Sequence, residues 1–178
     1  TAVLVLQGLS FLYFWFRDRE ATWLLLWGLP FVLGGFAILL YARPDWSSDF
    51  ISISVGNAVR MLAVISMWQG IRLFQGRRGQ PWVAAVVGGG WIGLCFVPAF
   101  GDSLVARVLT VSLVNGAICA AAAHELWRDR AEHLPSRMPL ALVFTSFAII
   151  MMIRAVFAVF TPFPFGTGTT NTLWLGAF

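Results

Sequence analysis

The sequence predicts an all-α membrane protein, a helical bundle of six full or near-full transmembrane helices plus the start of a seventh. Three observations predict this class. Hydrophobic residues make up 59% of the 178 residues and charged residues only 11%, whereas soluble domains have about 25% charged residues. The apolar residues form runs close to the roughly 20 helical residues that cross a bilayer. These runs do not alternate with a period of two, which excludes the strands of a membrane barrel.

The predicted helices follow one another with short connections. The first, Ala2–Phe16, is shorter than the others, and a seventh begins at Trp174 and is incomplete at Phe178. We therefore expect residues 1–178 to form a single transmembrane input domain of a longer protein, with an output domain after the seventh helix. The five predicted spans between these two are Trp23–Ala42, Phe50–Phe74, Trp82–Phe100, Leu104–Leu126 and Met138–Phe160.

Arginine is concentrated in alternate loops and predicts the orientation. The second loop has only Arg43, and the fourth and sixth loops have none. Because Arg-rich loops stay in the cytoplasm, we expect a bacterial inner-membrane protein with its N-terminus outside and its C-terminal side cytoplasmic. The net charge of +4 then reflects topology, and the expected partner is the lipid bilayer rather than nucleic acid. The arginines of the odd loops and their edges are Arg17, Arg19, Arg72, Arg77, Arg78, Arg128, Arg130 and Arg137.

Several residues inside the spans affect helix packing. Pro30 should kink the second span. Cys95 and Cys119 lie at different membrane depths, so we expect no disulfide between them. Two ridges of small residues predict close packing within the chain, with a subunit interface as the alternative. The ridges are Ala85, Gly89 and Gly93 in the fourth span and Ser112, Gly116 and Ala120 in the fifth.

Five polar residues inside the spans are candidates for ligand binding. An ionisable side chain costs about 2.5 to 3.5 kcal/mol at the bilayer centre, so each one needs a physical reason. Arg60 lies near the middle of its span, whereas Arg107 and Arg154 lie in the outer half, and no acidic residue lies inside a span at these depths. We predict a site for a small anionic or polar ligand that enters from the outer face. The candidates are Asn57, Arg60, Arg107, Asn115 and Arg154.

Each arginine also has a purely structural interpretation. Arg107 can reach the outer interface or pair with Asp102, and Arg154 can reach outward under more strain. Arg60 is too deep for this and would bond to Asn57, helix carbonyls, water or a ligand. The sequence leaves these alternatives open.

No pattern typical of catalysis is present in the sequence. It contains no nucleophile–base pair, paired carboxylates, dinucleotide fingerprint or P-loop. His124 and Glu125 end the fifth span, and with Glu132 and His133 they match no closed set of metal ligands. We expect these four residues to face the aqueous cytoplasmic interface, and we expect no cofactor and no metal in this chain.

Several short stretches together are similar to one known kind of membrane domain. They are Arg17–Glu20, Trp23–Gly28, Pro44–Trp46, Ile51–Ala58, Met67–Arg77, Arg107–Ser112 and Ile153–Ala155. In this order they resemble the seven-helix sensor region that precedes the GGDEF domain in many bacterial diguanylate cyclases. The similarity covers nearly the whole chain. Arg60 departs from the pattern, which has an aliphatic residue there, so a ligand pocket need not be shared.

The resemblance implies a signal-transduction input domain that controls synthesis of cyclic di-GMP from two GTP molecules. The cyclase domain would be cytoplasmic and would act as a homodimer. Its catalytic residues lie in that output domain, so none is carried onto this chain. Two alternatives are a small transporter or channel component and an accessory scaffold subunit of a membrane complex. The ridges favour the scaffold, whereas the two related halves expected of a transporter are not evident.

Overall fold

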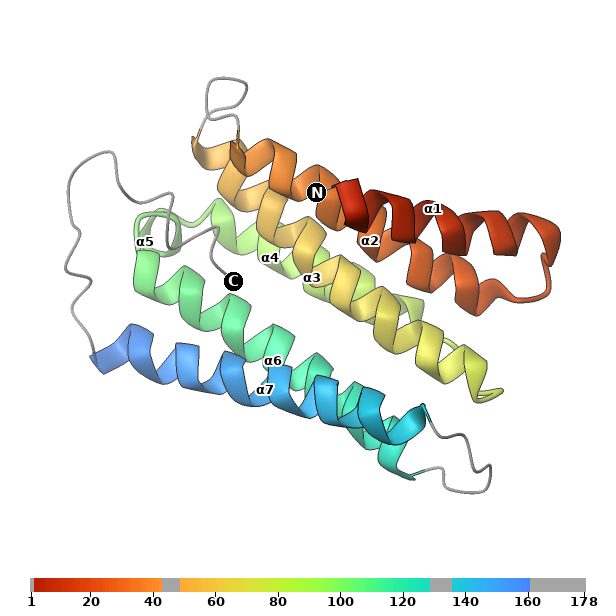
Figure 1. The fold of residues 1–178 in the computed structure, drawn as a ribbon. Coiled ribbons are helices and arrows are strands. Elements are labelled where there is room, and N and C mark those ends of the chain that lie inside the picture. Colours follow the sequence, from red (N-terminus) through yellow and green to blue (C-terminus); the bar gives the residue numbers. More distant parts are fainter. Residues whose placement is uncertain (1, 43–48, 129–135, 161–178) are drawn as a thin grey trace.

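The computed structural model describes residues 2–42, 49–128 and 136–160, and these ranges form helices joined by short turns (Figure 1). The all-helical class is confirmed. The seventh span predicted from Trp174 lies outside the described residues. The helices are α1 (Ala2–Arg17), α2 (Thr22–Ala42), α3 (Asp49–Phe74), α4 (Pro81–Cys95), α5 (Pro98–Gly101), α6 (Leu104–Arg128) and α7 (Arg137–Phe160).

The long helix α3 lies at the centre of the bundle. It packs against α2, α4 and α6, while α1 packs on α2 and α7 packs on α6 (Figure 1). Consecutive long helices run in opposite directions, so α3 and α6 run parallel. The C-terminal ends of α1, α3 and α6 therefore lie at the same end of the bundle as the N-terminal ends of α2, α4 and α7.

The prediction of six full transmembrane helices is wrong for this structure. Within the described ranges, only α6 and α7 are long and apolar enough to cross a membrane. α1 has 16 residues and α4 has 15. At 1.5 Å per residue they extend about 24 Å and 22 Å, less than the hydrocarbon core of roughly 30 Å. α3 has 26 residues, but Asn57, Arg60 and Gln69 interrupt its apolar sequence.

A proline explains why the predicted span Trp82–Phe100 is not one helix. Helix α4 stops at Cys95, and the short α5 starts at Pro98. Pro98 cannot donate a backbone hydrogen bond, and its ring disfavours the helical conformation at the residue before it. Val97 accordingly is extended, with φ −84° and ψ 115°. By contrast, α2 continues as a helix through Pro30.

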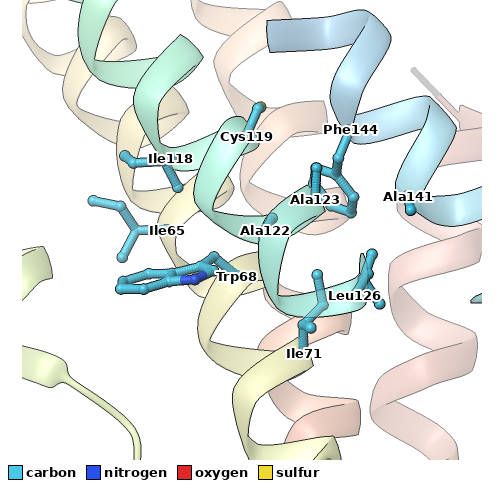
Figure 2. Packing of buried hydrophobic residues seen from close by; sticks show 10 residues of the cluster. All are labelled: Ile65, Trp68, Ile71, Ile118, Cys119, Ala122, Ala123, Leu126, Ala141 and Phe144. Carbon is cyan, nitrogen blue, oxygen red and sulfur yellow. The ribbon is translucent and has the colours of Figure 1, made fainter. Parts of the chain in front are cut away.

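The larger hydrophobic core joins α3, α6 and α7. Figure 2 shows its side chains, with Trp68 of α3 beside Ala122 of α6 and with Phe144 of α7 close to Ala123. A second cluster lies nearer the N-terminal ends of α3 and α6. There the indole N–H of Trp91 in α4 donates a hydrogen bond to the Ser54 carbonyl of α3 at 2.8 Å, which fixes α4 against α3. The second cluster contains Ala58, Met61, Trp91, Cys95 and Val111.

Glycines allow close helix contacts at some positions and not at others. A Cβ atom added at Gly70 of α3 would lie 2.5 Å from Trp27 of α2, and one added at Gly116 of α6 would lie 2.4 Å from the Met152 side chain of α7. In the α6 ridge, Ser112 and Gly116 are therefore packed within the chain, as predicted, whereas Ala120 is exposed. In α4, Gly89 and Gly93 are exposed and have no such neighbour within 4 Å. Its ridge faces outward.

Candidate functional site

Two groups of buried polar side chains involve α6, and the first is centred on Glu125. Glu125 is 7% exposed, and both Arg72 and Arg77 donate hydrogen bonds to its carboxylate as ion pairs. The side-chain amide of Gln75 donates to the Glu125 carbonyl at 3.1 Å. We call Arg72, Gln75, Arg77 and Glu125 the Glu125 cluster. It ties the C-terminal end of α3 to the C-terminal end of α6.

The turn after α3 places Arg77 in this cluster. Gly76 has a φ of 71°, a left-handed conformation that glycine adopts without a Cβ penalty. The Arg77 amide then donates to the Arg72 carbonyl at 2.9 Å. The Gln69 side chain closes the turn, because its amide donates to the Gln80 carbonyl at 2.7 Å and its oxygen accepts from the Gln80 N–H at 2.8 Å.

The expectation that Glu125 faces the aqueous interface is wrong, although its neighbour His124 is exposed. Glu125 lies on the buried side of α6 that also contains Asn115, Ile118 and Ala122. Residues three or four apart share one side of a helix. This spacing was the signal that could have placed Glu125 inside.

The second group lies in the middle of α6 and is not satisfied. Ser112 is 0% exposed and Asn115 is 3% exposed. The Ser112 hydroxyl and both amide atoms of Asn115 have no hydrogen-bond partner among the described residues. A buried polar group without a partner costs about 1 to 3 kcal/mol, so such groups need an explanation. Together they form what we call the α6 polar pair.

Arg60 of α3 comes to the height of this pair. The parallel helices pair Arg72 with Glu125 and bring Ile65 and Ile118 into one cluster, an offset of 53 positions in both cases. The same offset places Arg60 beside position 113 of α6. Arg60 itself is half-buried. That Arg60 points into the bundle stays a prediction.

Arg154 of α7 reaches the same height from the opposite side of α6. The two helices are antiparallel, since a Cβ at Gly116 would meet Met151 and Met152, while Ala141 shares a cluster with Leu126. This pairing places Arg154, which is half-buried, beside position 113. The α6 polar pair therefore lies at the height of an arginine on each of the two long helices that pack against α6.

The other predicted residues lie farther along the bundle. Asn57 is half-buried one turn before Arg60. Arg107 is half-buried near the start of α6, and its Nε has no hydrogen-bond partner in the described part of the chain. It lies six residues before position 113, about 9 Å along the helix. The structure thus places Arg60, Asn115 and Arg154 at one height and Arg107 apart from them. Sequence reasoning missed Ser112 as a site residue because it counted only as part of a small-residue ridge.

An apolar groove runs along the contact between α6 and α7. Its volume is about 720 Å³. Leu113, Gly116 and Ala117 of α6 line it beside Thr145 and Met152 of α7. Leu113 and Gly116 are the sequence neighbours of the two residues of the polar pair. None of the five predicted site residues lines it. The common cavity of Arg60, Arg107 and Arg154 stays a prediction.

The charged side chains nearest the α6 polar pair along the bundle are arginines. α7 has no acidic residue, and the acidic residues of α3 and α6 are Asp49 and Glu125, more than ten residues from this height. The polar pair therefore lies in positive surroundings. Within the described ranges, no three His, Cys, Asp or Glu side chains group as metal ligands would. No family model, curated protein or solved structure matches the chain.

Proposed function

We propose that this chain is a ligand-sensing input module of a membrane signalling protein. The observation that carries the proposal is the α6 polar pair, buried and unpartnered at the height of Arg60 and Arg154. Asn115 offers one donor and one acceptor group, and Ser112 offers both in one hydroxyl. Arginine guanidinium groups prefer carboxylate and phosphate. The expected ligand is therefore a small anion with hydrogen-bonding oxygens.

The exposure of α6 and α7 supports placing them in a membrane. Only 33% of the apolar stretch of α6 and 22% of that of α7 are buried inside the protein. A core helix of a soluble protein would be mostly buried. Large apolar side chains instead cover the outer sides of α7, among them Phe147, Ile150 and Phe157. We propose that the α6–α7 hairpin crosses the bacterial inner membrane and that lipid covers these side chains.

The arginines support the orientation of this hairpin. The described arginines of the odd loops lie at the bundle end formed by the C-terminal ends of α1, α3 and α6. By the positive-inside rule this end faces the cytoplasm. The Glu125 cluster lies there, 13 residues and about 20 Å along α6 from Ser112. Ligand binding that shifts α6 relative to α3 would change the positions of the paired side chains in this cluster.

The signalling role rests on the sequence resemblance described above. We propose that ligand binding favours one arrangement of α3 and α6 over another, which is the thermodynamic requirement for a signal. The output would be a cytoplasmic domain that makes cyclic di-GMP. The chain itself would bind and transmit, and would catalyse nothing.

Anion titration of the purified chain tests the proposal. The chain in phosphatidylcholine nanodiscs is heated with millimolar sodium acetate or inorganic phosphate, with sodium chloride at equal ionic strength as reference. A single site filled at about 100 times Kd raises the free energy of unfolding by about 2.7 kcal/mol. We expect one anion to raise Tm well above the chloride reference. The Ser112→Ala variant should lose most of this rise and keep its Tm without anion.

A matched serine serves as the control. Ser10 is exposed on α1, and its hydroxyl donates to the Leu6 carbonyl at 2.9 Å, so the Ser10→Ala variant should respond as the unchanged chain does. The proposal fails if neither anion raises Tm beyond chloride. It also fails if Ser10→Ala and Ser112→Ala reduce the rise equally.

A second candidate function is a scaffold subunit, and the outward ridge of α4 favours it. Ala85, Gly89 and Gly93 are exposed on one side of that helix, and small residues let a helix of another subunit approach closely. Sedimentation in detergent tests this. A scaffold should self-associate or bind a partner through this side, and the Gly89→Leu variant should weaken the association. A chain that sediments as a monomer at every concentration contradicts self-association.

A further inference from the structure

A second surface, distinct from the α6 polar pair, lies at the end of the bundle that contains the Glu125 cluster. It consists of the last turns of α3 and α6, the turn after α3 and the first turn of α7. Five arginines gather there around one described carboxylate, that of Glu125. They are Arg72, Arg77, Arg78, Arg128 and Arg137.

The charges of this surface do not cancel. Glu125 pairs with two arginines at once, so one positive charge remains within the cluster. Arg78 and Arg128 are exposed. Arg137 is half-buried, and its Nη1 is buried with no hydrogen-bond partner among the described residues. In sequence, residues 129–135 add one arginine and two acidic residues, which leaves the excess positive.

Exposed aromatic rings occur at the same end. Trp82 in the first turn of α4 is 60% exposed. Phe74 at the end of α3 and Trp127 near the end of α6 are also exposed. Tryptophan favours the headgroup region of a membrane, where its ring is in a partly apolar and its N–H in a polar environment. The surface therefore combines positive charge with rings suited to a lipid interface.

We infer that this surface binds the phosphate headgroup of an anionic phospholipid, through Arg78, Arg128 and Arg137. The inference rests on the proposed crossing of the membrane by the α6–α7 hairpin. Guanidinium forks bind phosphate oxygens with two parallel hydrogen bonds. The Glu125 cluster holds the turn after α3, which contains Arg78, against the end of α6, which contains Arg128. Bound lipid would thereby hold together the C-terminal ends of α3 and α6, which the proposed ligand binding would shift relative to each other.

The turn between α1 and α2 provides a matched comparison at the same end of the bundle. Arg17 and Arg19 there are accompanied by Asp18 and Glu20, so the turn is neutral. The guanidinium of Arg19 also lies 4.1 Å from the centre of the Trp15 ring. Arginine-to-glutamine changes made here remove positive charge from a place where no headgroup site is inferred.

Competition between two lipids tests the inference. The detergent-purified chain is mixed with equal amounts of phosphatidylglycerol and phosphatidylcholine, and the retained lipids are counted by native mass spectrometry. Each arginine near a headgroup contributes about fivefold in affinity, so we expect the unchanged chain to prefer phosphatidylglycerol about a hundredfold. Arg78→Gln, Arg128→Gln and Arg137→Gln should each lower the preference about fivefold. The Arg17→Gln, Arg19→Gln double variant should leave it within twofold.

The outcomes separate this inference from the proposed function. A chain that inserts into vesicles but retains both lipids equally overturns the headgroup site alone. Equal losses in the α3–α6 variants and in the control pair also overturn it, because the preference would then follow total charge. A chain that does not insert into vesicles of either lipid overturns both the membrane placement and the headgroup site.

Discussion

Helix α6 contains two buried polar groups that differ in one respect. At the C-terminal ends of the helices, Glu125 is buried and paired with Arg72 and Arg77. In the middle, Ser112 and Asn115 are more deeply buried but have no hydrogen-bond partner among the described residues. The charged members of the first group are paired within the chain, although the side-chain oxygen of Gln75 has no hydrogen-bond partner among the described residues. The second leaves donor and acceptor groups available to another molecule.

This difference indicates that the first group stabilises the fold and that the second is available for ligand binding. Removing one partner of a buried ion pair leaves an uncompensated charge and is costly. Removing a polar group that had no partner costs little, and the chain can even gain stability. The two groups should therefore respond in opposite ways to the same kind of substitution.

The largest expected effect comes from the Glu125 cluster. Glu125→Gln should lower the free energy of unfolding by about 3 kcal/mol, because two guanidinium groups lose their counter-charge. Chemical denaturation in mixed micelles measures this. Glu20→Gln, at an exposed glutamate in the turn after α1, should change stability by less than about 0.5 kcal/mol. Similar losses in the two variants would show that the cluster contributes no special stability.

Gln69 should give the next largest effect. Gln69→Ala removes both hydrogen bonds to the Gln80 backbone and should cost about 1 to 3 kcal/mol. Gln80→Ala is the matched control, since Gln80 takes part through its backbone alone in those two bonds and should lose far less. If the two variants unfold at the same denaturant concentration, the turn is not held as described.

The smallest effect is expected at the α6 polar pair. Ser112→Ala should leave the free energy of unfolding unchanged within about 0.5 kcal/mol, or raise it, because it removes an unsatisfied hydroxyl. The same denaturation series measures this value. A loss above about 1 kcal/mol would mean that Ser112 makes a stabilising hydrogen bond. The contrast with Glu125 would then disappear.

The sequence predicted the helices well and their lengths less well. The long apolar runs placed α6 and α7 within two residues of their observed starts and ends. The break at Val97 was missed because the span was predicted from apolar composition alone. Composition does not include the effect of Pro98, which disfavours the helical conformation at the residue before it. Helices α1, α4, α6 and α7 are all apolar, so counting apolar residues does not distinguish them. Their lengths do, because α6 and α7 are long enough to cross a membrane and α1 and α4 are shorter.

The candidate site was predictable in part. Arg60, Asn115 and Arg154 could be selected because polar residues within apolar runs are costly. Their common height depends on the pairing of α3, α6 and α7, which one sequence does not give. Glu125 was misjudged because its position near a helix end suggested solvent. Its partners are distant in sequence: Arg72 belongs to α3, and Arg77 belongs to the turn after α3 that contains Gly76.

Cysteine labelling along the α6–α7 hairpin tests the central claim most directly. Single cysteines are introduced at exposed Asp102, Phe147 and Ser136, with Cys95 and Cys119 replaced by alanine. The account predicts that an impermeant thiol reagent labels Asp102→Cys in intact cells and Ser136→Cys only after the inner membrane is opened, and that Phe147→Cys stays unlabelled in both. Labelling of Phe147→Cys as fast as Ser136→Cys would show that α7 faces water, and would contradict a hairpin that crosses the membrane.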